Sequence, residues 1–104
     1  MSFNGNEGAV VSLTDASRWT ANYRKTIYEG DIFALFAGRE KLLQILNQED
    51  CMGIRFYFGI GDDGKPNLVA VGADANENDM EQGVIVENFF PCPYHCSTAN
   101  PLNK

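Results

Sequence analysis

The sequence predicts an α+β fold, in which two helices pack on a small antiparallel sheet built around a β-hairpin. Residues 53–60 and 67–73 alternate like strands and lie on either side of the turn signal Asp63-Gly64. Two earlier segments carry apolar residues at helical spacing instead. At 104 residues the chain has the length of one domain, so we expect a single domain, residues 1–104, with its own core.

The first helix is predicted over residues 15–28. The stretch Ser12-Leu13-Thr14-Asp15 is a helix-start signal, because Ser and Thr side chains can cap the first free backbone N–H groups. Trp19, Tyr23 and Ile27 then follow at i, i+4 and i+8. They form one apolar stripe, which is typical of a helix face that packs against a core.

The second helix is predicted over residues 39–48, where the apolar side chains between Leu42 and Leu46 supply a wide face. Residues 31–37 are ambiguous, because their apolar positions would continue the same stripe upstream. Gly38 would weaken so long a helix by about 1 kcal/mol. We therefore place a break near Ala37-Gly38.

The turn determines which residues of the hairpin face each other. A two-residue turn at Asp63-Gly64 gives the pairs Phe58 with Val69, Phe56 with Val71 and Ile54 with Ala73, all on one face. A slip of one residue would move every side chain to the other face. The expected core combines helix and strand residues: Trp19, Tyr23, Leu42, Leu46, Phe56, Phe58, Val69 and Val71.

The remainder of the chain is predicted to be mostly irregular. Residues 74–83 form a polar loop, residues 84–86 a short strand, and residues 91–104 an irregular tail that contains Pro and Cys. Its prolines restrict φ and lower the entropy lost on ordering. We expect an ordered tail that covers the domain, with Cys92 and Cys96 reduced and buried.

Composition and charge exclude several classes of partner. The chain has 14 acidic and 8 basic residues, a net charge of −6, and this field disfavours nucleic acid and anionic membrane surfaces. The sequence contains neither a signal peptide nor an apolar run of about 18 residues. We expect a soluble, cytoplasmic protein whose three cysteines are reduced.

Two motif matches fail on their context. Residues 59–64 match G-x-G-x-x-G, but Pro66 and a second strand follow where a dinucleotide site requires a helix. Residues 74–85 begin like a calcium-binding loop, but Asp79 stands where Gly is required and Ile85 where a bidentate Glu belongs. A hairpin turn and a solvated acidic loop are the better interpretations.

The segment Cys92-Pro93-Tyr94-His95-Cys96 is rich in metal-ligating residue types. Cys92, His95 and Cys96 offer three of the four ligands of a tetrahedral zinc site, and Cys51 could supply the fourth. The spacing is unusual for a zinc knuckle, and the inserted His separates it from the redox motif C-x-x-C. We favour structural packing and no cofactor, with zinc as the alternative and redox chemistry third.

The remaining candidates are ligand-binding residues. Trp19, Tyr23, Arg39 and Tyr57 could line a small-molecule pocket, although aromatic residues on an amphipathic helix more often belong to the core. His95 is the only histidine, and nothing in the sequence links it to a particular Ser and Asp, so no Ser/His/Asp arrangement can be argued. No catalytic residue is assigned.

Several stretches carry a family resemblance: residues 19–24 (WTANYR), 36–40 (FAGRE), 53–57 (GIRFY) and the ending from Pro91-Cys92-Pro93 to Asn103. They resemble a family of small uncharacterised bacterial proteins, and the likeness runs from about residue 12 to residue 103. The order of the shared motifs agrees with the predicted helix, helix, hairpin and tail. The family carries no assigned activity, so the resemblance implies a shared fold and no function.

The expected function is therefore a small non-enzymatic binding or protein-interaction module. The alternatives are a small-molecule-binding enzyme or carrier, and a protein with a structural zinc site in its C-terminal segment. A three-stranded sheet with open edges would also invite pairing between chains, so we expect a homodimer.

Overall fold

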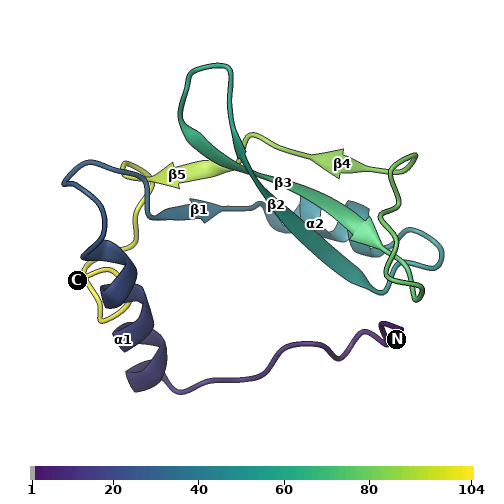
Figure 1. The fold of residues 1–104 in the computed structure, drawn as a ribbon, viewed down its shortest axis with the longest axis horizontal. Helices are drawn as coiled ribbons and strands as arrows, with labels where there is room; N and C mark the ends of the chain where they lie inside the picture. Colours follow the sequence, from purple (N-terminus) through teal and green to yellow (C-terminus); the bar gives the residue numbers. More distant parts are fainter. Residues whose placement is uncertain (1) are drawn as a thin grey trace. The chain divides into compact units, whose positions relative to one another are not determined.

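The computed structural model describes residues 2–104 and has the expected α+β composition. The chain divides into two compact units, each described here by itself. Unit 1 comprises Met1–Glu7 and Ala37–Phe90, and unit 2 comprises Gly8–Phe36 and Pro91–Lys104. Figure 1 shows the order of their elements along the chain. Within the described residues, no helix is long and apolar enough to cross a membrane.

Unit 1 contains the predicted hairpin. Strands β2 (Gly53–Ile60) and β3 (Pro66–Ala73) pair antiparallel, and β4 (Ile85–Val86) pairs antiparallel with β3, which gives the sheet order β2-β3-β4. Both long strands and the short third strand are thereby confirmed. Residues 74–83 form the predicted loop, with one bridge between Ala73 and Asp79.

The predicted register of the hairpin is wrong by one residue. Phe58 pairs with Leu68, Phe56 with Ala70 and Ile54 with Gly72. The reason lies in the turn: the Gly64 N–H donates to the Gly61 carbonyl at 2.9 Å, and the Gly61 N–H donates to the Lys65 carbonyl at 2.9 Å. Gly64 has φ +80°, as expected for a three-residue loop that ends in a left-handed bulge. The extra loop residue shifts all pairs by one.

Helix α2 (Arg39–Leu46) begins after Gly38, so the predicted break is confirmed. Its C-terminal end lies over β3 where the strand has small residues: a Cβ at Gly72 would come within 3.2 Å of Gln48 Nε2. Gln48 also joins the helix to the chain before β4, because its Oε1 accepts the Val84 N–H at 2.8 Å while its Nε2 donates to the Ile45 carbonyl at 2.9 Å.

The core is smaller than predicted and consists mainly of small side chains on β3. Ile45 of α2 is fully buried, and Ala70, Val71, Ala73 and Phe89 are also buried in unit 1. Of the predicted core, Val71 is buried and Leu42 and Val69 are half-buried, whereas the other five are exposed: Trp19, Tyr23, Leu46, Phe56 and Phe58. Apolar spacing located these residues on apolar faces, but their side chains remain between 43% and 94% exposed.

Unit 2 contains helix α1 (Leu13–Arg24), strand β1 (Ala34–Phe36) and strand β5 (Phe90–Cys92) apart from its first residue, and β1 and β5 form a two-stranded sheet. The Ser12 Oγ accepts the Asp15 N–H at 3.1 Å and caps α1 as predicted. The helix ends at Arg24 and not at residue 28, because the chain turns at Thr26, whose N–H donates to the Tyr23 carbonyl at 2.9 Å.

The ambiguous residues 31–37 are not part of the second helix. Residues 34–36 form β1, and the Phe33 N–H donates to the Cys92 carbonyl at 3.0 Å beside it. The prediction of an irregular tail is correspondingly wrong at its start, because residues 91 and 92 belong to strand β5. From residue 93 onward the tail consists of turns.

Candidate functional site

Unit 2 contains an open groove of about 680 Å³. Trp19 and Tyr23 line it from α1, Phe33 and Phe36 line it from β1 and the residue before β1, and Leu102 lines it from the tail. Most of these side chains are apolar, and two are the aromatic residues predicted as ligand-binding. We call this cavity the aromatic groove.

Helix α1 presents its apolar stripe to the aromatic groove without burying any of its own residues. Trp19 is 53% exposed and Tyr23 54% exposed, although a spacing of four residues sets them on one face of the helix. The Arg18 guanidinium lies 5.7 Å from the Trp19 ring centroid and pairs with Asp15 at 2.9 Å. The Trp19 indole therefore lies beside the Arg18 guanidinium, whose charge is balanced by Asp15.

Arg24 ties the last turn of α1 to the other walls of the groove. Its Nη1 donates to the Leu102 carbonyl, and its guanidinium lies 6.0 Å from the Phe33 ring centroid. Because one contact reaches the residue before β1 and the other reaches the tail, 78 residues further along the chain, this side chain positions the helix against the strand and the tail. Sequence reasoning missed it, since an Arg at the end of a helix is common.

The tail wall of the groove is held by two asparagines. The Asn103 Oδ1 accepts the Asn100 N–H at 2.8 Å, and the Asn100 Oδ1 accepts the Leu102 N–H at 2.8 Å. Their amide groups also donate to the Thr98 carbonyl, at 3.0 Å from Asn100 and 3.2 Å from Asn103. These local bonds shape the turn that carries Leu102 to the groove.

Cys92 and Cys96 form a disulfide, with their Cα atoms 4.8 Å apart. The expectation that both are reduced is wrong, and their sulfurs are not available as thiolate ligands while the bond is intact. Cys92 is buried and Cys96 exposed, so burial was predicted correctly for one of the two. The sequence did not predict this pair, because an odd number of cysteines, three, argues against a complete set of disulfides.

The other two predicted zinc ligands belong to different units. His95 lines the aromatic groove within the disulfide loop, and its backbone N–H donates to the Pro91 carbonyl at 2.8 Å. Cys51 belongs to unit 1, where its thiol donates to the Gly53 carbonyl at 3.2 Å. Across residues 2–104, no group of three or more His, Cys, Asp or Glu side chains is placed to hold a metal ion.

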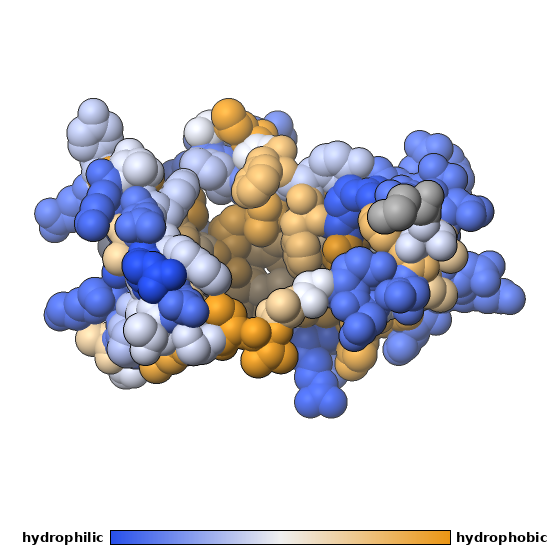
Figure 2. All heavy atoms as spheres, turned by 60° about the horizontal axis from the view of Figure 1, so that its bottom comes forward, coloured by the Kyte–Doolittle hydropathy of each residue, from blue (hydrophilic) through white to orange (hydrophobic). Residues whose placement is uncertain are grey.

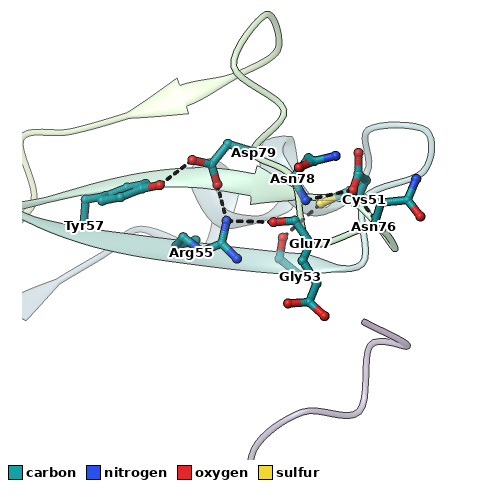
Figure 3. A network of polar contacts seen from close by, with 9 residues as sticks. Cys51, Gly53, Arg55, Tyr57, Asn76, Glu77, Asn78 and Asp79 are labelled. Carbon is teal, nitrogen blue, oxygen red and sulfur yellow. Dashed lines mark hydrogen bonds and ion pairs between the residues drawn. The ribbon is translucent and has the colours of Figure 1, made fainter. Parts of the chain in front are cut away.

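Arg39 and Tyr57, the other two predicted ligand-binding residues, do not line the aromatic groove. Arg39 is the exposed first residue of α2. Tyr57 lies on β2, where its hydroxyl donates to Asp79 Oδ2, and Arg55 Nη1 donates to Asp79 Oδ1 (Figure 3). The predicted set of four is thus divided between the two units.

The cluster of Arg55, Tyr57 and Asp79 fastens the loop after β3 to the face of β2. Arg55 Nη1 also donates to the Glu77 carbonyl at 3.3 Å (Figure 3). Its guanidinium lies 5.6 Å from the Phe3 ring centroid. In the same loop Asp74 Oδ1 accepts the N–H groups of Asn76 at 2.9 Å and Asn78 at 3.0 Å. The acidic residues that resembled a calcium loop therefore organise the loop itself.

The pKa values in this cluster move away from neutrality. The hydrogen bond from Tyr57, and then that from Arg55, lowers the pKa of the Asp79 carboxyl, although partial desolvation opposes this. The same carboxylate raises the pKa of the Tyr57 hydroxyl, helped by desolvation. A general acid or base works best with a pKa near the operating pH. The arrangement thus favours a structural clamp over proton transfer.

Asp79 could not have been selected from the sequence, because it is one of several acidic residues in a polar loop. Phe33 and Leu102 escaped notice for a similar reason, since neither belongs to a periodic stripe. Comparison with known proteins adds no assignment: no family model, no curated protein and no solved structure matches this chain.

Proposed function

We propose that the protein is a non-enzymatic binding module whose unit 2 receives a small, mainly apolar ligand in the aromatic groove. The observation that carries the proposal is the apolar stripe of α1, which lines the groove while none of the helix is buried. Most of the stability of a short helix comes from packing its apolar face. A ligand held between α1, β1 and the tail would supply that packing.

The size and chemistry of the aromatic groove support a small ligand. Its volume of about 680 Å³ lies within the range of about 300–1,000 Å³ typical of small-molecule sites. The cation at its wall, Arg24, already donates to the Leu102 carbonyl. Aromatic rings such as Trp19 and Tyr23 offer apolar area at little cost in side-chain entropy. These features favour a neutral, flat, apolar molecule or side chain over an anion.

The surface of the molecule is consistent with a binding role. Apolar residues, in orange, lie openly on the face seen in Figure 2. Exposed large hydrophobic residues occur in both units, among them Tyr23 and Phe36 in the groove. Within unit 2, the apolar lining of the aromatic groove is the kind of surface typical of ligand-binding and protein-interaction sites.

Trp19 supplies the test, because it is the only tryptophan in the chain and it lines the aromatic groove. We expect the neutral fluorophore N-phenyl-1-naphthylamine to quench Trp19 emission by energy transfer, with saturation in a titration. The substitution Tyr23→Lys should raise the dissociation constant of the fluorophore at least about tenfold, which corresponds to a loss of about 1.4 kcal/mol in binding free energy.

The matched control is Tyr28→Lys, because Tyr28 is an exposed tyrosine of the same unit that lies outside the groove. It should bind the fluorophore like the native chain, and circular dichroism should confirm that both variants are folded. Quenching that never saturates would count against the proposal. So would an equal loss of affinity in the two variants.

A further inference from the structure

Strand β2 forms an open edge of the unit 1 sheet. The sheet order is β2-β3-β4, so β2 has a partner strand on one side only. It is eight residues long and carries a single charged residue, Arg55. Phe58 is 94% exposed and Ile60 78% exposed on this strand. A long apolar edge of this kind is a template for pairing with another chain.

The backbone groups that point away from β3 belong to the even-numbered residues of β2. The Gly61 N–H donates to the Lys65 carbonyl at 2.9 Å, so Gly61 points toward β3. Hydrogen-bonded and non-hydrogen-bonded pairs alternate along an antiparallel ladder. Residues 59, 57 and 55 therefore also point toward β3. The N–H and C=O groups of four residues face the open edge: Ile54, Phe56, Phe58 and Ile60.

The sequence of this edge is nearly palindromic. Residues 53–61 are Gly-Ile-Arg-Phe-Tyr-Phe-Gly-Ile-Gly, and they read the same in both directions about Tyr57 except that Arg55 corresponds to Gly59. Two antiparallel copies related by a two-fold axis place residue i opposite residue j and residue j opposite residue i. A palindromic strand is thus complementary to itself when the axis passes through Tyr57.

We propose that the protein forms a dimer in which β2 pairs antiparallel with β2 of a second copy, with Tyr57 facing Tyr57 across a two-fold axis. In this register Phe56 faces Phe58 of the second copy and Ile54 faces its Ile60. All of these residues are even-numbered, so the paired positions are the ones whose backbone groups face the open edge. The proposal does not depend on a ligand in the aromatic groove, which belongs to unit 2.

Neighbouring registers fit less well. A shift by one residue would oppose outward-facing with inward-facing backbone groups, which breaks the ladder. A shift by two residues in either direction leaves one of the four outward-facing residues without a partner inside β2. In the symmetric register Arg55 faces Gly59 of the second copy, so no two like charges stand opposite each other.

Pairing through β2 closes the assembly at two chains. The other edge of the sheet is β4, which has only two residues, Ile85 and Val86. Very short edge strands are one of the ways in which proteins prevent further pairing. The dimer would contain a continuous six-stranded sheet in the order β4-β3-β2-β2-β3-β4, in which the three strands of each copy are counted.

Light scattering coupled to size exclusion tests the dimer. We expect twice the mass of the chain for the native protein, and a dimer dissociation constant raised at least about tenfold by Phe58→Lys. Tyr94→Lys is the matched control, because Tyr94 is also 94% exposed but lies in unit 2. It should leave the dimer intact. A monomeric native protein, larger polymers, or equal weakening by both variants would overturn the proposal.

Cross-linking tests the register, in a Cys51→Ser background that removes the free thiol. Residues that face each other in a non-hydrogen-bonded pair have Cα atoms about 4.5 Å apart, within the disulfide range of about 4.4–6.8 Å. Tyr57→Cys should therefore form a covalent dimer on mild oxidation. Phe58→Cys, one residue along, should do so much more slowly because it faces Phe56. Equal rates, or the reverse order, would refute the two-fold register at Tyr57.

Discussion

Replacing Ile45 by alanine tests where the core of unit 1 lies. Ile45 is carried by α2 and is 0% exposed. The substitution removes three carbon atoms, and at about 0.8 kcal/mol for each buried methylene the transfer loss is about 2.4 kcal/mol. The cavity left behind adds to this loss, because the surroundings relax only in part. We therefore expect the free energy of unfolding to fall by about 3–4 kcal/mol.

Urea unfolding followed by far-ultraviolet circular dichroism, at one fixed protein concentration, measures this loss. Ile85→Ala removes the same atoms from a side chain that is 53% exposed, so it should cost about 1 kcal/mol. If Ile45→Ala costs less than about 1 kcal/mol, or no more than Ile85→Ala, the assignment of the core to the contact of α2 with β3 is wrong.

Three further outcomes are expected. Gly64→Ala should lower the free energy of unfolding by about 1–2 kcal/mol in urea titrations because φ is +80° there, and an unchanged value would exclude the left-handed bulge. The lowered pKa of Asp79 stabilises the fold above about pH 4 and the raised pKa of Tyr57 stabilises it below about pH 10. Tyr57→Phe should therefore flatten the stability profile at both ends, and urea titrations that show equally steep limbs in the native chain and the variant would contradict the clamp. Intact mass under non-reducing conditions should be lower by two hydrogens than after reduction, and peptide mapping should join Cys92 to Cys96; free thiols at both would contradict the disulfide.

The hairpin was predictable from local signals, whereas its register was not. Alternation in β2 and β3 and the Asp63-Gly64 pair locate both strands. The same Gly64 can end a two-residue turn or supply the left-handed residue of a three-residue loop, and the two differ by one residue in register. The hydrogen bonds of Gly61 show that the loop has three residues, and no residue pattern in the sequence distinguishes the two turns.

A periodic pattern likewise shows that a helix or strand has an apolar face, but it does not show whether another element covers that face. The stripe of α1 was located correctly, yet Trp19 and Tyr23 remain half exposed in the aromatic groove. Strand β1 was ambiguous because its partner β5 lies more than 50 residues further along the chain. Half of the candidate ligand-binding residues were therefore brought together, and the residues that hold the groove in shape were found only in the structure.

The course of the chain through the two units has a consequence for the protein during its synthesis. Unit 1 is built from nearly contiguous sequence, Ala37–Phe90 with a short N-terminal addition, whereas unit 2 needs Gly8–Phe36 and Pro91–Lys104 together. Strand β1 is synthesised more than 50 residues before its partner β5, so their sheet cannot form until residues 90–92 have left the ribosome. During that interval the apolar side chains of β1 lack their partner strand, and the aromatic groove lacks the wall that the tail supplies.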